Sequence, residues 1–271
     1  MKRVFFVTAC LFSLAMLQAQ VKEGTIMYER KINMHKTIQD EQMRAMMPEF
    51  RTSRHMLLFS DSVSVYKAVP DDEAPDPFAG GGGPRVVMRF GGSDGGDLYK
   101  NLTQSKSIQS SELGGKNFLI TDTIQQQPWK IGTETKQILG YTCHKASRKI
   151  TQAAPMIRRM VMSGGGSPTQ DTTTQSRPQG KEVEVVAWYA ENIISPVGPE
   201  SYGQLPGVIL QLDVDNATTV YTATEVKKTV DRKELKEPKK GKTVTRPEFQ
   251  KMMMEMMNSQ GPGGFRINNS N

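Results

Sequence analysis

WYAENIISPVGPESYGQLPGVILQLD, residues 188–213, begins and ends in strand-like sequence and joins the two ends through prolines and glycines. Its prolines fix φ and push the residues before them toward extended backbone. Leu205-Pro206-Gly207 predicts a tight turn with proline in the second position and glycine in the third. Gly198, Gly203 and Gly207 permit positive φ. We therefore expect a stiff crossing between two core strands.

Short strand-like runs recur along the rest of the chain, separated by turn residues. Strands are expected at 24–31, 56–59, 63–69, 97–103, 106–110, 117–122, 129–133, 135–139, 143–150, 183–189, 208–214, 218–224 and 225–230. Many short strands in succession favour an antiparallel sheet. The predicted fold is mainly β (α+β): a curved antiparallel sheet or half-barrel, with one or two short Met-rich helices and disordered loops.

Two Met-rich stretches have helical spacing. The first covers residues 35–50, where Pro48 interrupts it, and the second follows Pro247 in the tail at 246–271. Thioethers suit Cu(I), but no Cys or His accompanies the tail cluster. A flexible helix that docks its methionines on the domain or on a partner is the preferred interpretation, and Cu(I) binding is the lesser alternative.

The domain organisation follows from composition. Residues 20–245 form a single β-rich domain with flexible insertions near 70–96 and 163–180, which are rich in Gly, Pro and polar residues. Neither glycine run has the ending of a phosphate loop. The basic stretch at 227–242 could meet nucleic acid or anionic lipid. Because acidic residues interrupt it, a solvated edge strand and turn is the preferred interpretation.

Composition excludes several classes of protein. The chain has 271 residues, 35 Lys and Arg against 28 Asp and Glu, two Cys and three His. That length suits one large domain or two modest ones. Two Cys exclude a disulfide-dense scaffold and a Cys-only zinc site, and three His argue against a His-rich metal centre. We expect no metal and no cofactor.

The N-terminus has the three-part layout of a secretory signal peptide at residues 1–19. Lys2 and Arg3 precede an apolar run at 4–17, and Ala19 offers a cleavage point. Val7-Thr8-Ala9-Cys10 looks like a lipobox, so lipidation at Cys10 is the minority alternative. We expect export to the periplasm or the outer membrane. No later stretch reaches transmembrane length, and Cys143 would then be a lone, buried thiol.

An ordered series of residues carries a resemblance. Its members are Trp129, Glu134, Thr135, Lys136, Ile138, Leu139, Gly140, Tyr141, Cys143, Lys145, Ala146, Ala187, Trp188, Tyr189, Gly198, Pro199, Leu205, Pro206, Gly207 and Ile209. In this series the chain resembles the GLPGLI family of exported proteins, typical of Bacteroidetes. That family has no established activity, so the resemblance implies a compartment and a fold. We expect these residues to be a structural signature and name no catalytic residue.

The naming hexapeptide of that family aligns with residues 204–209. Gln204 replaces the first glycine and Val208 replaces the leucine. The loss of this glycine suggests that its backbone freedom is not essential here. The strand order also looks like that of the lipoprotein-localisation carriers, whose curved sheet wraps an apolar ligand. This second resemblance is an analogy at the level of the fold.

Three functions follow in order of preference. The first is a non-enzymatic periplasmic protein that binds a lipid, another apolar ligand or a partner on a concave sheet, and no nucleic acid. The second is an accessory or interaction protein for outer-membrane transport or surface assembly, which predicts exposed edge strands or an apolar patch. The third is a hydrolase, although Cys143 and His144 would point to opposite faces of a strand and common hydrolase motifs are missing.

Overall fold

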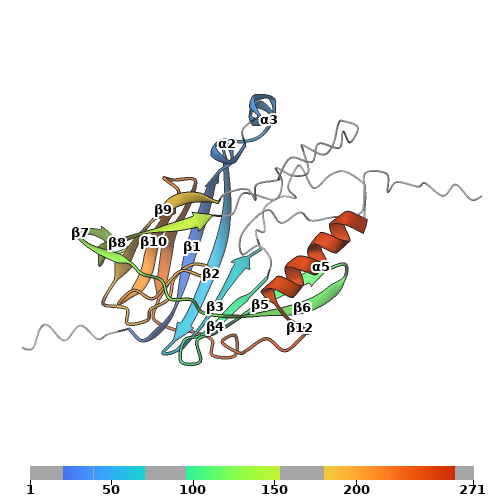
Figure 1. Cartoon of the computed structure of the whole chain (residues 1–271). Helices are drawn as coiled ribbons and strands as arrows, with labels where there is room; N and C mark the ends of the chain where they lie inside the picture. Colours follow the sequence, from blue (N-terminus) through green and yellow to red (C-terminus); the bar gives the residue numbers. More distant parts are fainter. Residues whose placement is uncertain (1–20, 39, 71–95, 153–179, 260–271) are drawn as a thin grey trace, which may run out of the picture.

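The computed structural model describes residues 21–38, 40–70, 96–152 and 180–259. They form one open, curved sheet of 12 strands with three short helices (Figure 1). The predicted signal segment and nearly all of the two predicted insertions lie outside the described residues. The predicted fold class, a mainly β chain with a curved antiparallel sheet, is confirmed.

The sheet is antiparallel at every pairing except one. In chain order its strands are β1 (Glu23–Asn33), β2 (Phe50–Ser60), β3 (Val63–Val69), β4 (Leu98–Asn101), β5 (Lys106–Leu113), β6 (Lys116–Thr123), β7 (Lys130–Ile138), β8 (Tyr141–Gln152), β9 (Lys181–Ala190), β10 (Val208–Val214), β11 (Thr219–Lys227) and β12 (Lys242–Thr245). Across the sheet they run β12-β6-β5-β4-β3-β2-β1-β11-β10-β9-β8-β7. Only β12, beside β6, is parallel to its neighbour. In the described sheet, the first and last strands of this order, β12 and β7, are the two edges.

Some strand bounds differ from those predicted. The two strands expected at 129–139 are one strand, β7, with a register shift between Ile131 and Thr135. The two expected at 218–230 are also one strand, β11. The helix expected at 35–50 is shorter: α2 (Met34–Thr37) and α3 (Glu41–Met46) precede β2, which begins at Phe50. Pairing with β1 provides hydrogen bonds for residues 50–55 and overrides their local spacing.

Both faces of the sheet carry apolar rows. One row runs across four strands through Ile26, Leu57, Tyr66 and Leu98, which are cross-strand partners; we call this the inner face. A second row runs through Leu58, Val65, Tyr99 and Ile108 on the outer face. Both rows are buried, so each face needs a cover from elsewhere in the chain.

The helix α5 (Arg246–Ser259) covers the β12 end of the sheet (Figure 1). Thr245 and Glu248 form a capping box at its start: the Thr245 amide donates to the Glu248 carboxylate at 2.7 Å, and the Glu248 amide donates to the Thr245 hydroxyl at 3.4 Å. The Glu248 carboxylate accepts hydrogen bonds from the Thr245 amide and hydroxyl, and these lower the pKa of Glu248. Phe249 packs edge-on against Phe118 of β6, with ring centroids 5.7 Å apart. The predicted Met-rich tail helix is therefore present in the described residues.

Candidate functional site

Residues 191–207, the crossing segment, link β9 to β10 and lie on the inner face. Ile193, Val197 and Leu205 are buried there in the main hydrophobic cluster. Val197 also bridges to Gly203, so the segment folds back on itself. At the end of the segment, the Tyr28 hydroxyl of β1 donates a 2.5 Å hydrogen bond to the Ile209 carbonyl. The predicted crossing between two core strands is present, and its apolar residues are buried.

Glycines in this region are required for close packing more than for positive φ. A Cβ on Gly207 would lie 2.1 Å from the Ala190 carbonyl oxygen, and one on Gly198 would lie 2.8 Å from the Ile209 Cδ1. Neither glycine has φ in the left-handed region; Gly203 has φ +158°. Gly198 and Gly207 therefore do not use the positive φ that glycine permits; the lack of space for a side chain excludes other residues there.

Gln204 contradicts a second expectation. Its φ is +63°, the left-handed conformation that favours glycine, so the first position of the hexapeptide does need that freedom here. The Gln204 side chain offsets this strain with two hydrogen bonds. Its Oε1 accepts from the Gln127 amide at 2.8 Å, and its Nε2 donates to the Gln125 carbonyl at 2.9 Å.

A buried polar cluster holds the middle of the crossing segment. The Glu200 carboxylate accepts a 2.5 Å hydrogen bond from the Tyr221 hydroxyl of β11 and lies 3.8 Å from the Arg30 guanidinium of β1. Burial, and then the charge of Glu200, raises the pKa of Tyr221 well above its ordinary value. Arg30 is only 4% exposed, so this is a charge pair largely removed from water.

Lys100 of β4 completes the cluster from the other half of the sheet. Its ammonium donates to the carbonyls of Glu200 at 2.8 Å and Tyr202 at 3.2 Å. Burial lowers the pKa of Lys100 to about 8, although the Glu200 charge opposes this shift. Burial also raises the pKa of Tyr202 to about 12. Strands β1, β4 and β11 thus converge on one turn of the crossing segment.

The two tryptophans each lie beneath a cation. Trp129 donates from its indole N–H to the Gly203 carbonyl at 2.9 Å, and the Arg148 guanidinium lies 5.3 Å from its ring centroid. Lys136 lies 4.1 Å from the ring centroid of Trp188 and donates to the Gln211 side chain. Such cation–π contacts are attractive. Trp129 therefore ties the approach to β7 to the crossing segment.

The β7–β8 hairpin turns through Leu139 and Gly140, with φ of +49° and +79°. Two successive residues with positive φ are typical of a tight two-residue hairpin turn. Tyr141 pairs with Ile138 across the turn. Cys143 is a free, buried thiol, as expected; burial raises its pKa to about 11.

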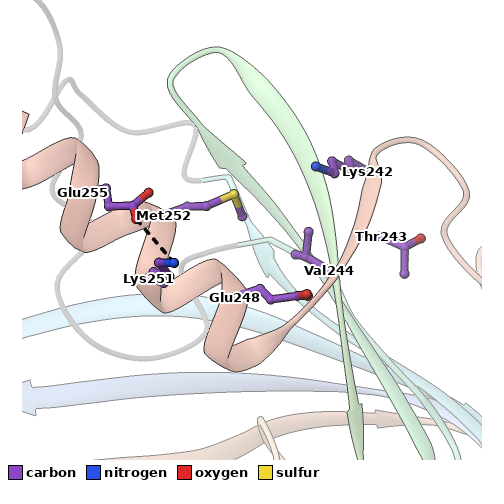
Figure 2. Close-up of a pocket in the computed structure, with 7 residues that line it drawn as sticks. All are labelled: Lys242, Thr243, Val244, Glu248, Lys251, Met252 and Glu255. Carbon is purple, nitrogen blue, oxygen red and sulfur yellow. Dashed lines mark ion pairs between the residues drawn. The ribbon is translucent and has the colours of Figure 1, made fainter.

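A pocket of about 290 Å³ lies between α5 and β12 (Figure 2). It is lined from the strand by Lys242, Thr243 and Val244, and from the helix by Glu248, Lys251, Met252 and Glu255. Lys251 and Glu255 form an ion pair at 3.8 Å, drawn as the dashed line in Figure 2. Since the walls carry both signs of charge, the pocket indicates no charged ligand.

Within the described ranges, no group of three or more His, Cys, Asp and Glu side chains is placed to hold a metal ion. No helix in those ranges is both long and apolar enough to cross a membrane.

Residues 129–211 match the model of a family described as Porph_ging, a protein of unknown function. This segment is of the GLPGLI type. The match covers less than a third of the chain and takes in the signature residues from Trp129 to Ile209. No curated protein sequence matches the chain.

Solved structures show a likeness of fold. Two crystal forms of PNGF-II, in space groups P21 and C2, each match with a TM-score of 0.50 and 15% identity over 86% of this chain. The chain spans about a third of the length of those PNGF-II chains, with 34% and 33% covered. The crystal structure of LprF from Mycobacterium bovis matches with a TM-score of 0.28 and 13% identity, over 82% of this chain and 92% of that one.

The GLPGLI-type signature residues are brought together by the fold. They lie just before β7, in the hairpin β7–β8, in β9, in the crossing segment and at the start of β10. Six of them are buried in the main hydrophobic cluster: Cys143, Ala146, Ala187, Tyr189, Leu205 and Ile209. Sequence reasoning missed the charges that hold this segment: Arg30, Lys100 and Glu200. A signal existed in the strand alternation. Arg30 lies two residues after Tyr28, and Lys100 lies two residues after Leu98, so each cation is on the same face of its strand as a core residue.

Proposed function

We propose that this protein is an exported, non-enzymatic component of the cell envelope that binds a partner polypeptide by strand addition at β7. The observation that carries the proposal is that, among the described residues, β7 pairs with a neighbouring strand on one side only. A strand at the edge of a sheet presents unpaired N–H and C=O groups, and a peptide can add to such an edge through main-chain hydrogen bonds.

The side chains along β7 favour this role. Ile131 is 51% exposed, and Leu139 at the following turn is 47% exposed. Charged side chains commonly guard sheet edges. On β7, Lys136 lies back over Trp188 and Glu134 is paired with Lys145 of β8, which leaves exposed Lys130 at the start of the strand as its one charge without a described acidic partner. Thr133 and Thr135 are exposed and suit a strand. The edge thus offers apolar contacts beside open hydrogen-bonding groups.

The opposite edge is less suited to a partner. β12 is four residues long, starts with Lys242 and runs directly into α5. Short edge strands and lysines discourage pairing with another chain. The inner face is also less suited to a ligand, because Ile193, Val197 and Leu205 of the crossing segment already pack on it. These features favour partner binding at β7 over an apolar ligand held inside the sheet.

Site-specific photo-crosslinking in intact cells tests this proposal. The crosslinking residue replaces Gln137, which is exposed on β7. The matched control replaces Glu184, which is exposed on β9 but lies in a strand paired on both sides. We expect a discrete polypeptide adduct from position 137, lost in the Ile131→Lys background, and none from position 184. Equal adducts from both positions, or none from either, would overturn the proposal.

A further inference from the structure

Residues 228–241, the strap, cross the outer face of the sheet between β11 and β12. Val230 and Leu235 pack against the outer apolar row. The Thr25 hydroxyl of β1 donates to the Thr229 carbonyl at 2.9 Å. The basic stretch predicted to be an edge strand and turn is therefore an irregular cover, fixed by its apolar side chains to β2–β6.

The acidic side chains of the strap are used in contacts with the sheet. Glu234 pairs with Lys67 of β3 at 2.7 Å, and Glu237 pairs with Lys106 of β5 at 2.7 Å. The Asp231 carboxylate accepts from the Lys233 amide at 2.9 Å, inside the strap. Glu234 and Glu237 therefore neutralise cations of the sheet and not the lysines of the strap.

Five lysines of the strap are exposed. None of them has an acidic side chain within ion-pair distance among the residues that the structure describes; they are Lys228, Lys233, Lys236, Lys239 and Lys240. The strap's arginine, Arg232, is instead paired with Glu23 at 2.5 Å. The segment that covers the outer face therefore carries five exposed lysines without an acidic partner among the described residues.

We propose that the strap docks the protein on a lipid surface that bears anionic phosphate groups. Each lysine close to such a surface strengthens attachment by about fivefold, and the effect fades within roughly 10 Å in salt. Several cations on one exposed covering segment suit a negatively charged surface. The strap contains no Phe, Tyr or Trp, which single-stranded nucleic acid sites use for stacking on bases. The lipid surface is therefore favoured over nucleic acid.

This docking is separate from partner binding, because β7 lies at the far edge of the sheet from β12. The test is co-sedimentation of the full chain with mixed phosphatidylcholine–phosphatidylglycerol vesicles and with phosphatidylcholine vesicles. The strap variant carries Lys236→Glu, Lys239→Glu and Lys240→Glu. The control variant carries Lys130→Glu, Lys149→Glu and Lys181→Glu, which change the net charge equally on β7, β8 and β9.

We expect the unchanged chain to prefer the anionic vesicles, and salt to weaken that preference. The strap variant should bind them at least about a hundredfold more weakly, while the control variant loses less than tenfold and both keep the far-UV circular dichroism of the unchanged chain. The proposal is overturned by equal losses in the two variants, by binding indifferent to lipid charge, or by strap-dependent binding to a single-stranded oligonucleotide without binding to vesicles. If the charge-reversal variant does not fold, the milder Lys236→Gln, Lys239→Gln and Lys240→Gln variant is compared with Lys130→Gln, Lys149→Gln and Lys181→Gln by the same criteria.

Discussion

The ammonium of Lys100 on β4 donates a 2.8 Å hydrogen bond to the main-chain carbonyl of Glu200, a residue of the crossing segment 100 positions further along the chain. Lys100 is only 4% exposed. Through this bond, a strand from one half of the sheet holds a segment that links two strands of the other half. The crossing segment therefore covers the inner face and is attached to strands in both halves of the sheet.

Replacing Lys100 with methionine should destabilise the fold. The variant leaves the Glu200 and Tyr202 carbonyls without their donor, and an unpaired buried acceptor costs roughly 1–3 kcal/mol. Removing a buried charge offsets part of that cost, so we expect a net loss of about 2 kcal/mol in the free energy of unfolding. Urea unfolding followed by circular dichroism measures it. A variant as stable as the unchanged chain would show that these hydrogen bonds contribute nothing.

The stability advantage of the unchanged chain over the Lys100→Met variant should depend on pH. The pKa of Lys100 is lowered to about 8 in the folded chain from 10.5. Below about pH 8 the group is charged in both states, and the cost of burying the charge is fully present. Between these values the folded chain has released a proton that the unfolded chain keeps, so the advantage grows with pH, by at most about 1.4 kcal/mol per pH unit.

The comparison of the two chains isolates this effect. Cys143 and the buried tyrosines have raised pKa values, which lowers stability as pH rises, but they are present in both chains. Urea unfolding of both chains at about pH 7 and about pH 9.5 gives the difference. If the stability advantage of the unchanged chain stays constant or falls between these two pH values, the lowered pKa of a buried Lys100 is contradicted.

At position 204 a glycine variant should be more stable than an alanine variant, the reverse of the usual order. Gln204→Ala loses both side-chain hydrogen bonds and keeps the strained φ, and should cost about 2 kcal/mol. Gln204→Gly loses the same bonds but removes the strain, which is worth about 1 kcal/mol. We expect the order of stability Gln, Gly, Ala in thermal unfolding. An alanine variant more stable than the glycine variant would show that the position does not need positive φ.

Gly207 should tolerate no side chain. A Cβ there would meet the main-chain oxygen of Ala190 at 2.1 Å, and backbone on both sides would have to move. We expect Gly207→Ala to lower the free energy of unfolding by more than about 3 kcal/mol. The control is Gly115→Ala, at φ +73° with nothing within 4 Å, which should cost only about 1 kcal/mol. Similar melting temperatures for the two variants would contradict the close packing.

The Cys143 thiol should be unreactive in the folded chain. It is fully buried and its pKa is raised to about 11, so the thiolate is scarce at neutral pH. Iodoacetamide labelling followed by peptide mass mapping should modify Cys143 only after urea is added. Rapid labelling of the native chain at this position would contradict the buried thiol and reopen a catalytic role.

Local patterns predicted individual strands well. β3 (Val63–Val69) and β10 (Val208–Val214) begin and end where the sequence predicts, because each is an apolar run between turn residues. Boundaries failed where pairing across the sheet overrides local spacing, as at Phe50. The parallel pairing of β12 with β6 and the cover made by the strap depend on contacts between distant segments, which no local pattern reports.

The signature residues could be named from a resemblance, but not the cluster that holds them. Arg30, Lys100 and Glu200 come from three separate parts of the chain, and their residue types are ones that usually lie on the surface. Only the alternation of their strands marks Arg30 and Lys100 as inward-facing. Gln204 could not be predicted for a different reason. Comparison with the family shows that Gln204 replaces a glycine, but only the structure shows that the position has positive φ.

The central claim is that the protein binds a polypeptide at its edge and holds no apolar ligand inside the sheet. Native mass spectrometry of the chain, isolated gently from an envelope extract with lipid extraction of the same sample, tests it most directly. The account predicts the bare mass of the chain, or that mass plus a polypeptide. A lipid or acyl species present in near one-to-one amount, and kept by the strap variant, would contradict it.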